Sequence, residues 1–206
     1  LTAPASASWA AIFDYAWQIF SQPVPPDKIG QTIVQRDRDL DAVDLLLASA
    51  AWDLWQTYDT EVEHTADALA TWWISQLGGK AVLILDGLSL REVPWLLQGA
   101  QARGYQIGQT KVTGAELPAD TTPFAKALGF AQRSALANNQ AGHSHRLAGA
   151  MTESVDWPWL DCAQLIGAEP HWVLWHHWPD YQVHKLGETG AGLDKLAQEA
   201  AEKLTS

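Results

Sequence analysis

The sequence predicts an α/β fold with a mostly parallel sheet flanked by helices, preceded by a helical N-terminal extension. Residues 81–85 and 173–175 are short, unbroken apolar runs, which are typical of strands buried on both faces of a parallel sheet. Other stretches place apolar residues at steps of three and four, which predicts amphipathic helices. Strands that alternate with helices along the chain indicate a parallel sheet.

The region from residue 1 to 78 is predicted to be the helical extension. Helices are expected over residues 9–20, 41–58 and 60–77. A proline-rich run at 23–26 must end the first helix, because proline removes a hydrogen-bond donor and clashes with the preceding turn. Thr60 and Glu63 have the spacing of a capping box, and Gly78-Gly79 follows as a helix stop. No convincing chemical motif lies in this region.

The region from residue 79 to 206 is predicted to be the α/β domain. Besides its two strands, helices are expected over 91–102, from Pro123 onward and over 191–204, with a third strand-like stretch near 105–112. Thr122 directly precedes Pro123, which suits the first position of a helix, so Thr122 is a candidate helix cap.

Composition narrows the functional classes. The 206 residues are 47% hydrophobic, as expected of a chain that buries a core, and carry a formal charge of −11. That charge argues against nonspecific nucleic-acid binding, which requires lysines and arginines on the phosphates.

Cys162 is the only cysteine, which fits a reducing, cytoplasmic setting. No apolar run is long enough to cross a bilayer, so no membrane association is expected. Because the chain starts without methionine and stops within a helical pattern, we expect a piece of a longer polypeptide.

Polar side chains follow the predicted strands at the places where an α/β sheet binds its ligands. Asp86 ends the strand that begins at residue 81, and Asp180 and His184 follow the strand around residue 174. Thr121 and Thr122 precede a helix, where free N–H groups favour an anion. Ligands of open α/β sheets bind at the carboxyl ends of the strands. Oxygen and nitrogen donors of this kind suit zinc or manganese.

Each of these residues also has an ordinary structural explanation. An aspartate after a buried strand often caps the next helix, Thr-Thr-Pro is a common helix start, and an aspartate four residues before a histidine is a weak signal by itself. His176 and His177 lie beside the proposed site; adjacent strand residues point to opposite faces, so one of them at most is expected to face it. Arg91 could meet a phosphate oxygen or lie on a helix surface.

Three segments in this order resemble one known family. Residues 82–91 (VLILDGLSLR) resemble the strand and aspartate that open the catalytic domain of alkaline phosphatase superfamily enzymes, most of all the PglZ branch, which occurs in bacterial phage-defence systems. Residues 117–126 (LPADTTPFAK) resemble the segment that holds the family's threonine or serine nucleophile. Residues 178–185 (WPDYQVHK) resemble the aspartate and later histidine that hold one metal. The resemblance covers roughly residues 80 to 206.

The resemblance implies a role for each residue. Asp86 would ligate one metal ion, and Asp180 and His184 the other, with two zinc ions expected and manganese as the alternative. Spacing to the following residues favours Thr122 as the nucleophile, whereas the T-x-P pattern of some relatives favours Thr121. The family completes its site with a later Asp-His-Gly segment that this sequence lacks. The polypeptide alone is therefore expected to be inactive.

Three hypotheses follow. The first is a metal-dependent phosphatase or phosphodiesterase acting on a phosphate ester, with nucleotides and nucleic-acid ends as options between which the sequence does not choose. The second is an inactive scaffold or binding module of the same fold, within a multi-protein assembly such as a defence complex. The third is an unrelated α/β interaction protein.

Overall fold

The computed structural model describes residues 4–49, 51–76, 78–140, 142, 144–189 and 193–205. The chain divides into two compact units, each built from segments that are distant in sequence. Residues 1–62, 89–113 and 182–206 form the helical unit, and residues 63–88 and 114–181 form the sheet unit. The division therefore does not follow a single boundary at residue 78. No helix among the described residues has the length and apolar character needed to span a membrane.

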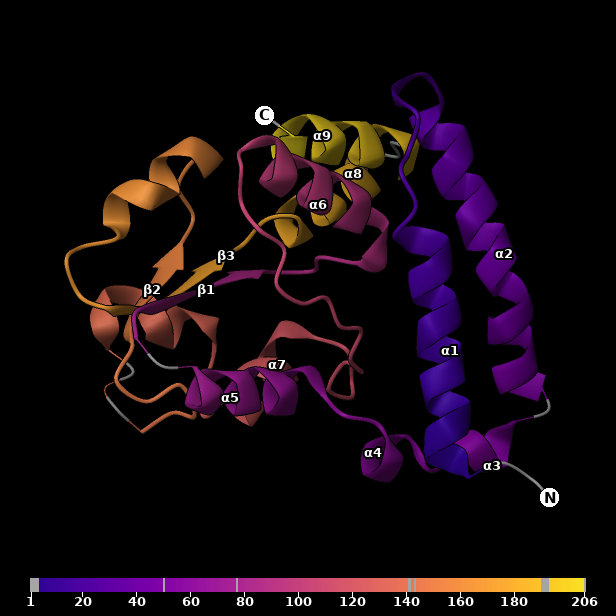
Figure 1. Cartoon of the computed structure of the whole chain (residues 1–206), viewed down its shortest axis with the longest axis horizontal. Helices are drawn as coiled ribbons and strands as arrows, with labels where there is room; N and C mark the ends of the chain where they lie inside the picture. The colour runs from indigo at the N-terminus through magenta and orange to yellow at the C-terminus, as the bar shows by residue number, and fades with distance from the viewer. Residues whose placement is uncertain are drawn as a thin grey trace. The chain divides into compact units, whose positions relative to one another are not determined.

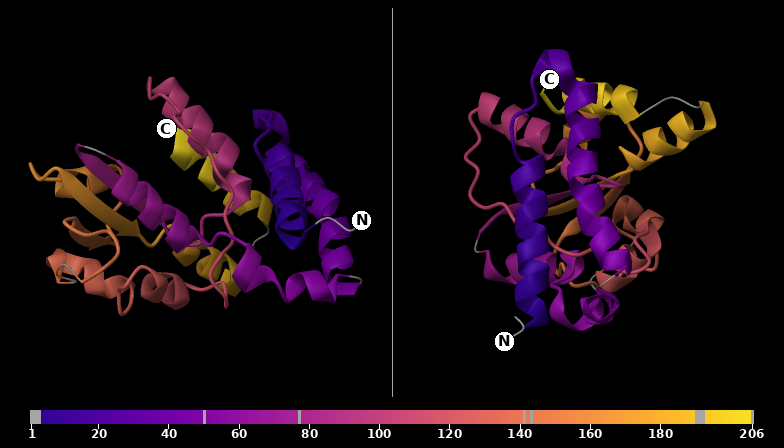
Figure 2. Two further views of the ribbon diagram at one scale, coloured as in Figure 1. Left: turned by 60° about the horizontal axis from the view of Figure 1, so that its bottom comes forward. Right: turned by 90° about the vertical axis from the view of Figure 1, so that its right-hand side faces the viewer.

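The helical unit contains two long helices and several shorter ones. Its elements are α1 (Ala5–Phe20), η1 (Pro26–Lys28), α2 (Ile29–Ser49), α3 (Trp52–Trp55), α4 (Tyr58–Glu61), η2 (Leu90–Glu92), α6 (Val93–Ala102) and α9 (Leu193–Thr205). Figures 1 and 2 show α1 and α2 running side by side in opposite directions. A hydrophobic cluster of Trp9, Tyr58 and Val62 packs with Leu47 and Leu54. Gly99 lets α6 approach the backbone of α9 at Leu204, where a Cβ atom would clash.

Buried polar groups connect the helices of this unit. Arg36 is buried in α2, and its guanidinium donates hydrogen bonds to the carbonyl oxygens of Phe20, Gln22 and Pro23, which lie at and just after the end of α1. Glu92 is also buried and forms a capping box with Ser89. Both charged groups therefore satisfy backbone atoms at element ends.

The sheet unit is a small α/β structure. Its elements are α5 (Thr65–Ser75), β1 (Lys80–Leu85), α7 (Thr121–Ala127), η3 (Arg133–Asn139), β2 (Met151–Val155), η4 (Trp159–Leu165) and β3 (His171–His176). The three strands are parallel in the order β1-β3-β2. The predicted parallel sheet flanked by helices is thus confirmed. Helix α8 (Asp180–Thr189) begins in this unit, and its residues from Gln182 onward belong to the helical unit.

Each face of the sheet has its own apolar core. On one face, α5 and α7 cover Val173 and Trp175 of β3, with Val82 and Ile84 of β1 packed against them (Figure 1). On the other face, Trp172 and Leu174 of β3 pack with Val155 and with Cys162 of η4. Alternate residues of β3 therefore serve opposite cores, and both faces of this central strand are buried, as the apolar run predicted.

Several element predictions need correction. The strand expected near 105–112 is wrong: these residues form no strand, and Tyr105 is 68% exposed with no neighbouring strand to pair with. The second helix starts earlier, at Ile29, and ends at Ser49. The Thr60 capping box is wrong, because Thr60 lies in α4 and the next helix begins at Thr65. Its expected end at Leu77 lies outside the described residues.

Candidate functional site

Asp86 lies at the carboxyl end of the sheet. Its N–H donates to the carbonyl of His176 at 3.0 Å, which extends the pairing of β1 with β3 by one residue. Its own carbonyl accepts a hydrogen bond from the N–H of Asp180 at 2.8 Å. Gly87, with φ of +73°, permits this approach, because a Cβ atom there would lie 3.1 Å from Cβ of Asp180. The ends of β1 and β3 therefore bring two aspartates together.

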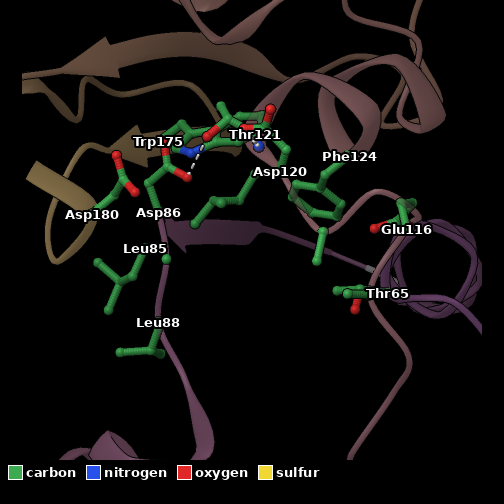
Figure 3. A pocket seen from close by; sticks show the side chains of 14 residues that line it. Thr65, Leu85, Asp86, Leu88, Glu116, Asp120, Thr121, Phe124, Trp175 and Asp180 are labelled. Carbon is green, nitrogen blue, oxygen red and sulfur yellow. Dashed lines mark hydrogen bonds between the residues drawn. The ribbon is translucent and has the colours of Figure 1, made fainter. Parts of the chain in front are cut away.

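Thr121 completes the cluster from a third segment. Its hydroxyl donates a hydrogen bond to Oδ1 of Asp86 at 2.9 Å (Figure 3). Asp120 is the N-cap of α7, and its side chain accepts from the N–H of Thr121. Thr121 is consequently the first residue of the helix, which begins two residues before the expected start at Pro123. Thr122 is exposed and does not line the pocket described next.

These side chains line a pocket of about 330 Å³ within the sheet unit. Its acidic lining residues are Asp86, Glu116, Asp120 and Asp180, and its larger apolar ones are Ile84, Leu85, Leu88, Phe124 and Trp175. Figure 3 shows Asp86 beneath Thr121, with Phe124 between this pair and Glu116. Glu116 accepts a hydrogen bond from the N–H of Ala66 at 2.8 Å and so caps α5. No lysine, arginine or histidine is among the described residues that line the pocket.

The carboxyl group of Asp86 is in an unusual electrostatic environment. Burial raises its pKa above the ordinary value, and the nearby negative charge of Asp180 raises it further. The Thr121 hydrogen bond and the positive charge of Arg133 lower the pKa but do not outweigh burial. The indole N–H of Trp175 is buried and forms no hydrogen bond of normal geometry within the described structure, yet it is close enough to favour the ionised carboxylate slightly.

Arg133 connects Asp86 to an outer pair of polar residues. Its Nε lies 4.0 Å from Oδ2 of Asp86, and its Nη1 lies 2.9 Å from Oδ1 of Asp156. The same Asp156 oxygen is 2.7 Å from Nδ1 of His177. Partial burial alone would raise the pKa of Asp156, but the hydrogen bonds from His177 and Arg133 prevail and lower it.

The structure brings together three of the five predicted site residues. Asp86, Asp180 and Thr121 line one pocket, whereas Thr122 does not. His184 lies one turn beyond Asp180 in α8, is exposed, and is not one of the pocket-lining residues.

The other residues considered from sequence have different surroundings. His176 is buried; its Nδ1 accepts from the N–H of Trp178, so its Nε2 carries the proton that is donated to the carbonyl of Trp157. His177 contacts Asp156, and neither histidine lines the pocket. Arg91 pairs with Asp37 within the helical unit.

Sequence reasoning missed four contributors to the site. Asp120 could have been found, since an aspartate before Thr-Thr-Pro is a strong N-cap signal. Trp175, Arg133 and Asp156 carry no local signal, because only the tertiary fold places them near Asp86.

The donor set favours a hard cation. The carboxylates of Asp86 and Asp180 and the hydroxyl of Thr121 are oxygen donors, as Mg²⁺ and Mn²⁺ prefer, and these ions are commonly held by one or two carboxylates plus water and substrate phosphates. Zinc usually takes three or four protein ligands. Among the described residues, no group of three or more histidine, cysteine, aspartate or glutamate side chains could hold an ion. Two carboxylates and one hydroxyl are ligands of the kind that Mg²⁺ and Mn²⁺ accept, and they are fewer than the protein ligands that two zinc ions usually take.

Comparison of the chain with protein-family models gives no match, and comparisons with curated proteins and with solved structures give no significant match.

Proposed function

We propose that this chain contributes the nucleophile side of a metal-dependent phosphoric-ester hydrolase of the alkaline phosphatase type, similar to PglZ domains, with Thr121 as the nucleophile. The observation that carries the proposal is the 2.9 Å hydrogen bond between the Thr121 hydroxyl and Asp86 at the carboxyl edge of the parallel sheet. A hydroxyl, two carboxylates and a pocket meet where α/β proteins bind ligands. The earlier preference for Thr122 is replaced by Thr121 in this proposal.

Each residue would have a distinct task. Asp86 and Asp180 would hold a divalent ion, which supplies positive charge that lowers the pKa of a nearby hydroxyl and stabilises a transferring phosphoryl group. The hydrogen bond to Asp86 fixes the Thr121 proton on that carboxylate, which leaves a lone pair of Oγ1 for a phosphorus atom. Attack by Oγ1 would form a phosphothreonine and release the alcohol, and water would then hydrolyse that ester.

The substrate would be a phosphate ester. The pocket lining combines carboxylates with the apolar surfaces of Leu85, Leu88 and Phe124. Because the lining contains no cationic residue among those described, an anionic phosphate depends on the bound cation for its attraction. A nucleotide or nucleic-acid end, and assembly with other proteins of a phage-defence system, remain part of the proposal through the family resemblance alone.

The test measures cation binding first and turnover second. Mn²⁺ titration followed by electron paramagnetic resonance should show binding to the wild-type chain and at least a tenfold loss of affinity in Asp86→Asn and Asp180→Asn, since each removes one charged ligand. Asp67→Asn is the matched control, because Asp67 is a carboxylate of the same unit that pairs with Arg146 and does not line the pocket.

Turnover then tests the nucleophile. Because the chain alone is expected to be inactive, turnover is measured in a polypeptide that also contains the family's later Asp-His-Gly segment. There, hydrolysis of nitrophenyl phosphate and bis-nitrophenyl phosphate with Mn²⁺ should fall by about 10³-fold or more in Thr121→Ala, with partial recovery in Thr121→Ser. A larger loss in Thr122→Ala than in Thr121→Ala would contradict the assignment of the nucleophile. Hydrolysis that is independent of added cation would contradict the metal requirement.

A scaffold of the same fold is the second candidate. It is favoured by the observation that no three-ligand cluster occurs within the described part of the chain. A wild-type protein that binds neither Mn²⁺ nor Zn²⁺ while remaining folded would decide for the scaffold.

A further inference from the structure

The two oxygens of the Asp86 carboxylate face different partners. Oδ1 accepts the hydrogen bond from Thr121 at 2.9 Å, and Oδ2 lies 4.0 Å from Nε of Arg133. The first contact is a normal hydrogen bond, whereas the second is a loose ion pair without hydrogen-bond length. Only 11% of the Asp86 side chain is exposed, so water screens this pair weakly.

Arg133 is held more tightly by a second carboxylate. Its Nη1 lies 2.9 Å from Oδ1 of Asp156, and the ring of His177 contacts the same oxygen at 2.7 Å. Asp156 is 63% exposed, while the side chain of Arg133 is 23% exposed. The guanidinium is therefore shared between two carboxylates: the exposed Asp156, which lies at hydrogen-bond distance, and the partly buried Asp86, which lies farther away.

We propose that Arg133 is a built-in counter-ion that competes with a divalent cation for Asp86, and that Asp156 limits this competition by holding the guanidinium away. The inference rests on the cation site of the proposed function but concerns how strongly that site binds. Arg133 acts on the cation through Asp86 and is a positioning residue.

Charge accounts for the competition. A guanidinium keeps its charge at all accessible pH values, so Arg133 cannot leave the site by losing a proton. Without a cation, Asp86 and Asp180 repel each other, and Arg133 offsets part of that repulsion. A divalent ion bound to Asp86 would instead be repelled by the guanidinium of Arg133. The guanidinium lies 4.0 Å from this carboxylate, a distance at which charges near a protein surface interact appreciably.

The experiment compares Mn²⁺ affinities of single variants in the full 206-residue chain. Arg133→Gln should bind Mn²⁺ about three- to tenfold more tightly than wild type, because the competing charge is gone. Asp156→Asn should bind about threefold or more weakly, because the released guanidinium turns to Asp86. Unfolding of Arg133→Gln would lower its Mn²⁺ affinity. A gain in affinity therefore cannot result from unfolding.

Controls separate a local effect from general charge. Arg146→Gln and Asp67→Asn make the same charge changes in a second ion pair of the sheet unit, with 2.7 Å between its partners and outside the pocket lining, and should change affinity by less than about twofold. In the Arg133→Gln background, Asp156→Asn should have almost no further effect, since Asp156 acts through Arg133. Arg133→Lys, which keeps the charge, should resemble wild type more than Arg133→Gln does.

The outcomes distinguish this inference from the proposed function. If wild type binds Mn²⁺ and Arg133→Gln binds equally or less tightly, the inference is overturned and the cation site stands. If Asp156→Asn weakens binding equally in both backgrounds, long-range charge explains the effect and the inference is likewise overturned. Tighter Mn²⁺ binding in Arg133→Gln supports the inference. Unchanged turnover in Thr121→Ala would contradict only the proposed nucleophile and would leave the inference standing. Absence of Mn²⁺ binding in wild type and in Arg133→Gln overturns both.

Discussion

Glu92 of the helical unit is buried and Asp86 of the sheet unit is partly buried. Desolvation raises the pKa of both carboxyl groups, yet their surroundings differ. Oε2 of Glu92 accepts hydrogen bonds from the N–H of Ser89 at 2.8 Å and from its hydroxyl at 2.6 Å. Asp86 receives a single hydroxyl hydrogen bond and otherwise faces a pocket, a second aspartate and a distant guanidinium. The Glu92 carboxylate stabilises the start of a helix, whereas the Asp86 carboxylate keeps oxygen lone pairs that can bind a ligand. Burial alone therefore does not identify a functional acid; the partners of its oxygens do.

Arg36 and Arg133 give the same comparison for cationic side chains. Substitution of Arg36 is expected to have the largest effect on stability. Its buried guanidinium satisfies three backbone carbonyls around the end of α1, whereas Arg133 pairs with carboxylates near a pocket. Arg36→Met should lower the free energy of unfolding by about 3 kcal/mol, because buried carbonyls lose their donors. Urea denaturation measures this loss. A change below about 1 kcal/mol would mean that water replaces the guanidinium readily.

Substitution of the two carboxylates should separate stability from binding. Glu92→Ala should cost about 1–2 kcal/mol of unfolding free energy, as expected for loss of a capping box, and leave Mn²⁺ affinity unchanged. Asp86→Asn should abolish most Mn²⁺ binding and leave the metal-free protein equally stable or more stable by about 0.5–1 kcal/mol, because a buried charge is removed. Urea denaturation and Mn²⁺ titration of the same two variants provide both measurements. Asp86→Asn with a capping-type loss of stability would place Asp86 in the same structural class as Glu92.

The parts of the fold that the sequence predicts are those whose signals are local. β3 is recognisable because its apolar run is unbroken, which follows from burial on both faces. β1 has an equally unbroken run, but the expectation that both of its faces are buried is wrong, because it lies at the edge of the sheet with Leu83 50% exposed. β2 escapes detection because Thr152, Glu153 and Ser154 are polar; Thr152 is nevertheless buried, since its hydroxyl donates to the carbonyl of Leu136 at 2.9 Å. A tertiary hydrogen bond therefore allows Thr152 to be buried, and the sequence around Thr152 does not indicate its partner.

The site follows the same rule. Asp86 and Asp180 were predictable because each follows a strand or leads into a helix at the carboxyl edge of a parallel sheet. The choice between Thr121 and Thr122 depends on where the helix begins, and the Asp120 cap shifts that start enough to change which hydroxyl faces Asp86. Arg133 and Asp156 come from loops and a short helix far along the chain, so their contribution to the site depends on the folded structure.

The smallest expected effect is a pair of opposite pH dependences. Folding raises the pKa of Glu92, so its protonated form is favoured in the folded state, and its contribution to stability improves as the pH falls through that raised pKa. Folding lowers the pKa of Asp156, so its ionised form is favoured; its contribution is present above the unfolded pKa and is lost as the pH falls through the lowered value.

Unfolding free energies of wild type, Glu92→Gln and Asp156→Asn between neutral and acidic pH test these signs. Acidification should shift the difference between wild type and Glu92→Gln in favour of wild type, and should erase the advantage of wild type over Asp156→Asn. Because Asp156 is largely exposed, solvent screening limits that advantage to a few tenths of a kcal/mol, so replicate denaturation curves are needed. Two differences that move in the same direction with pH would show that the buried cap and the ion pair do not differ in the way their contacts indicate.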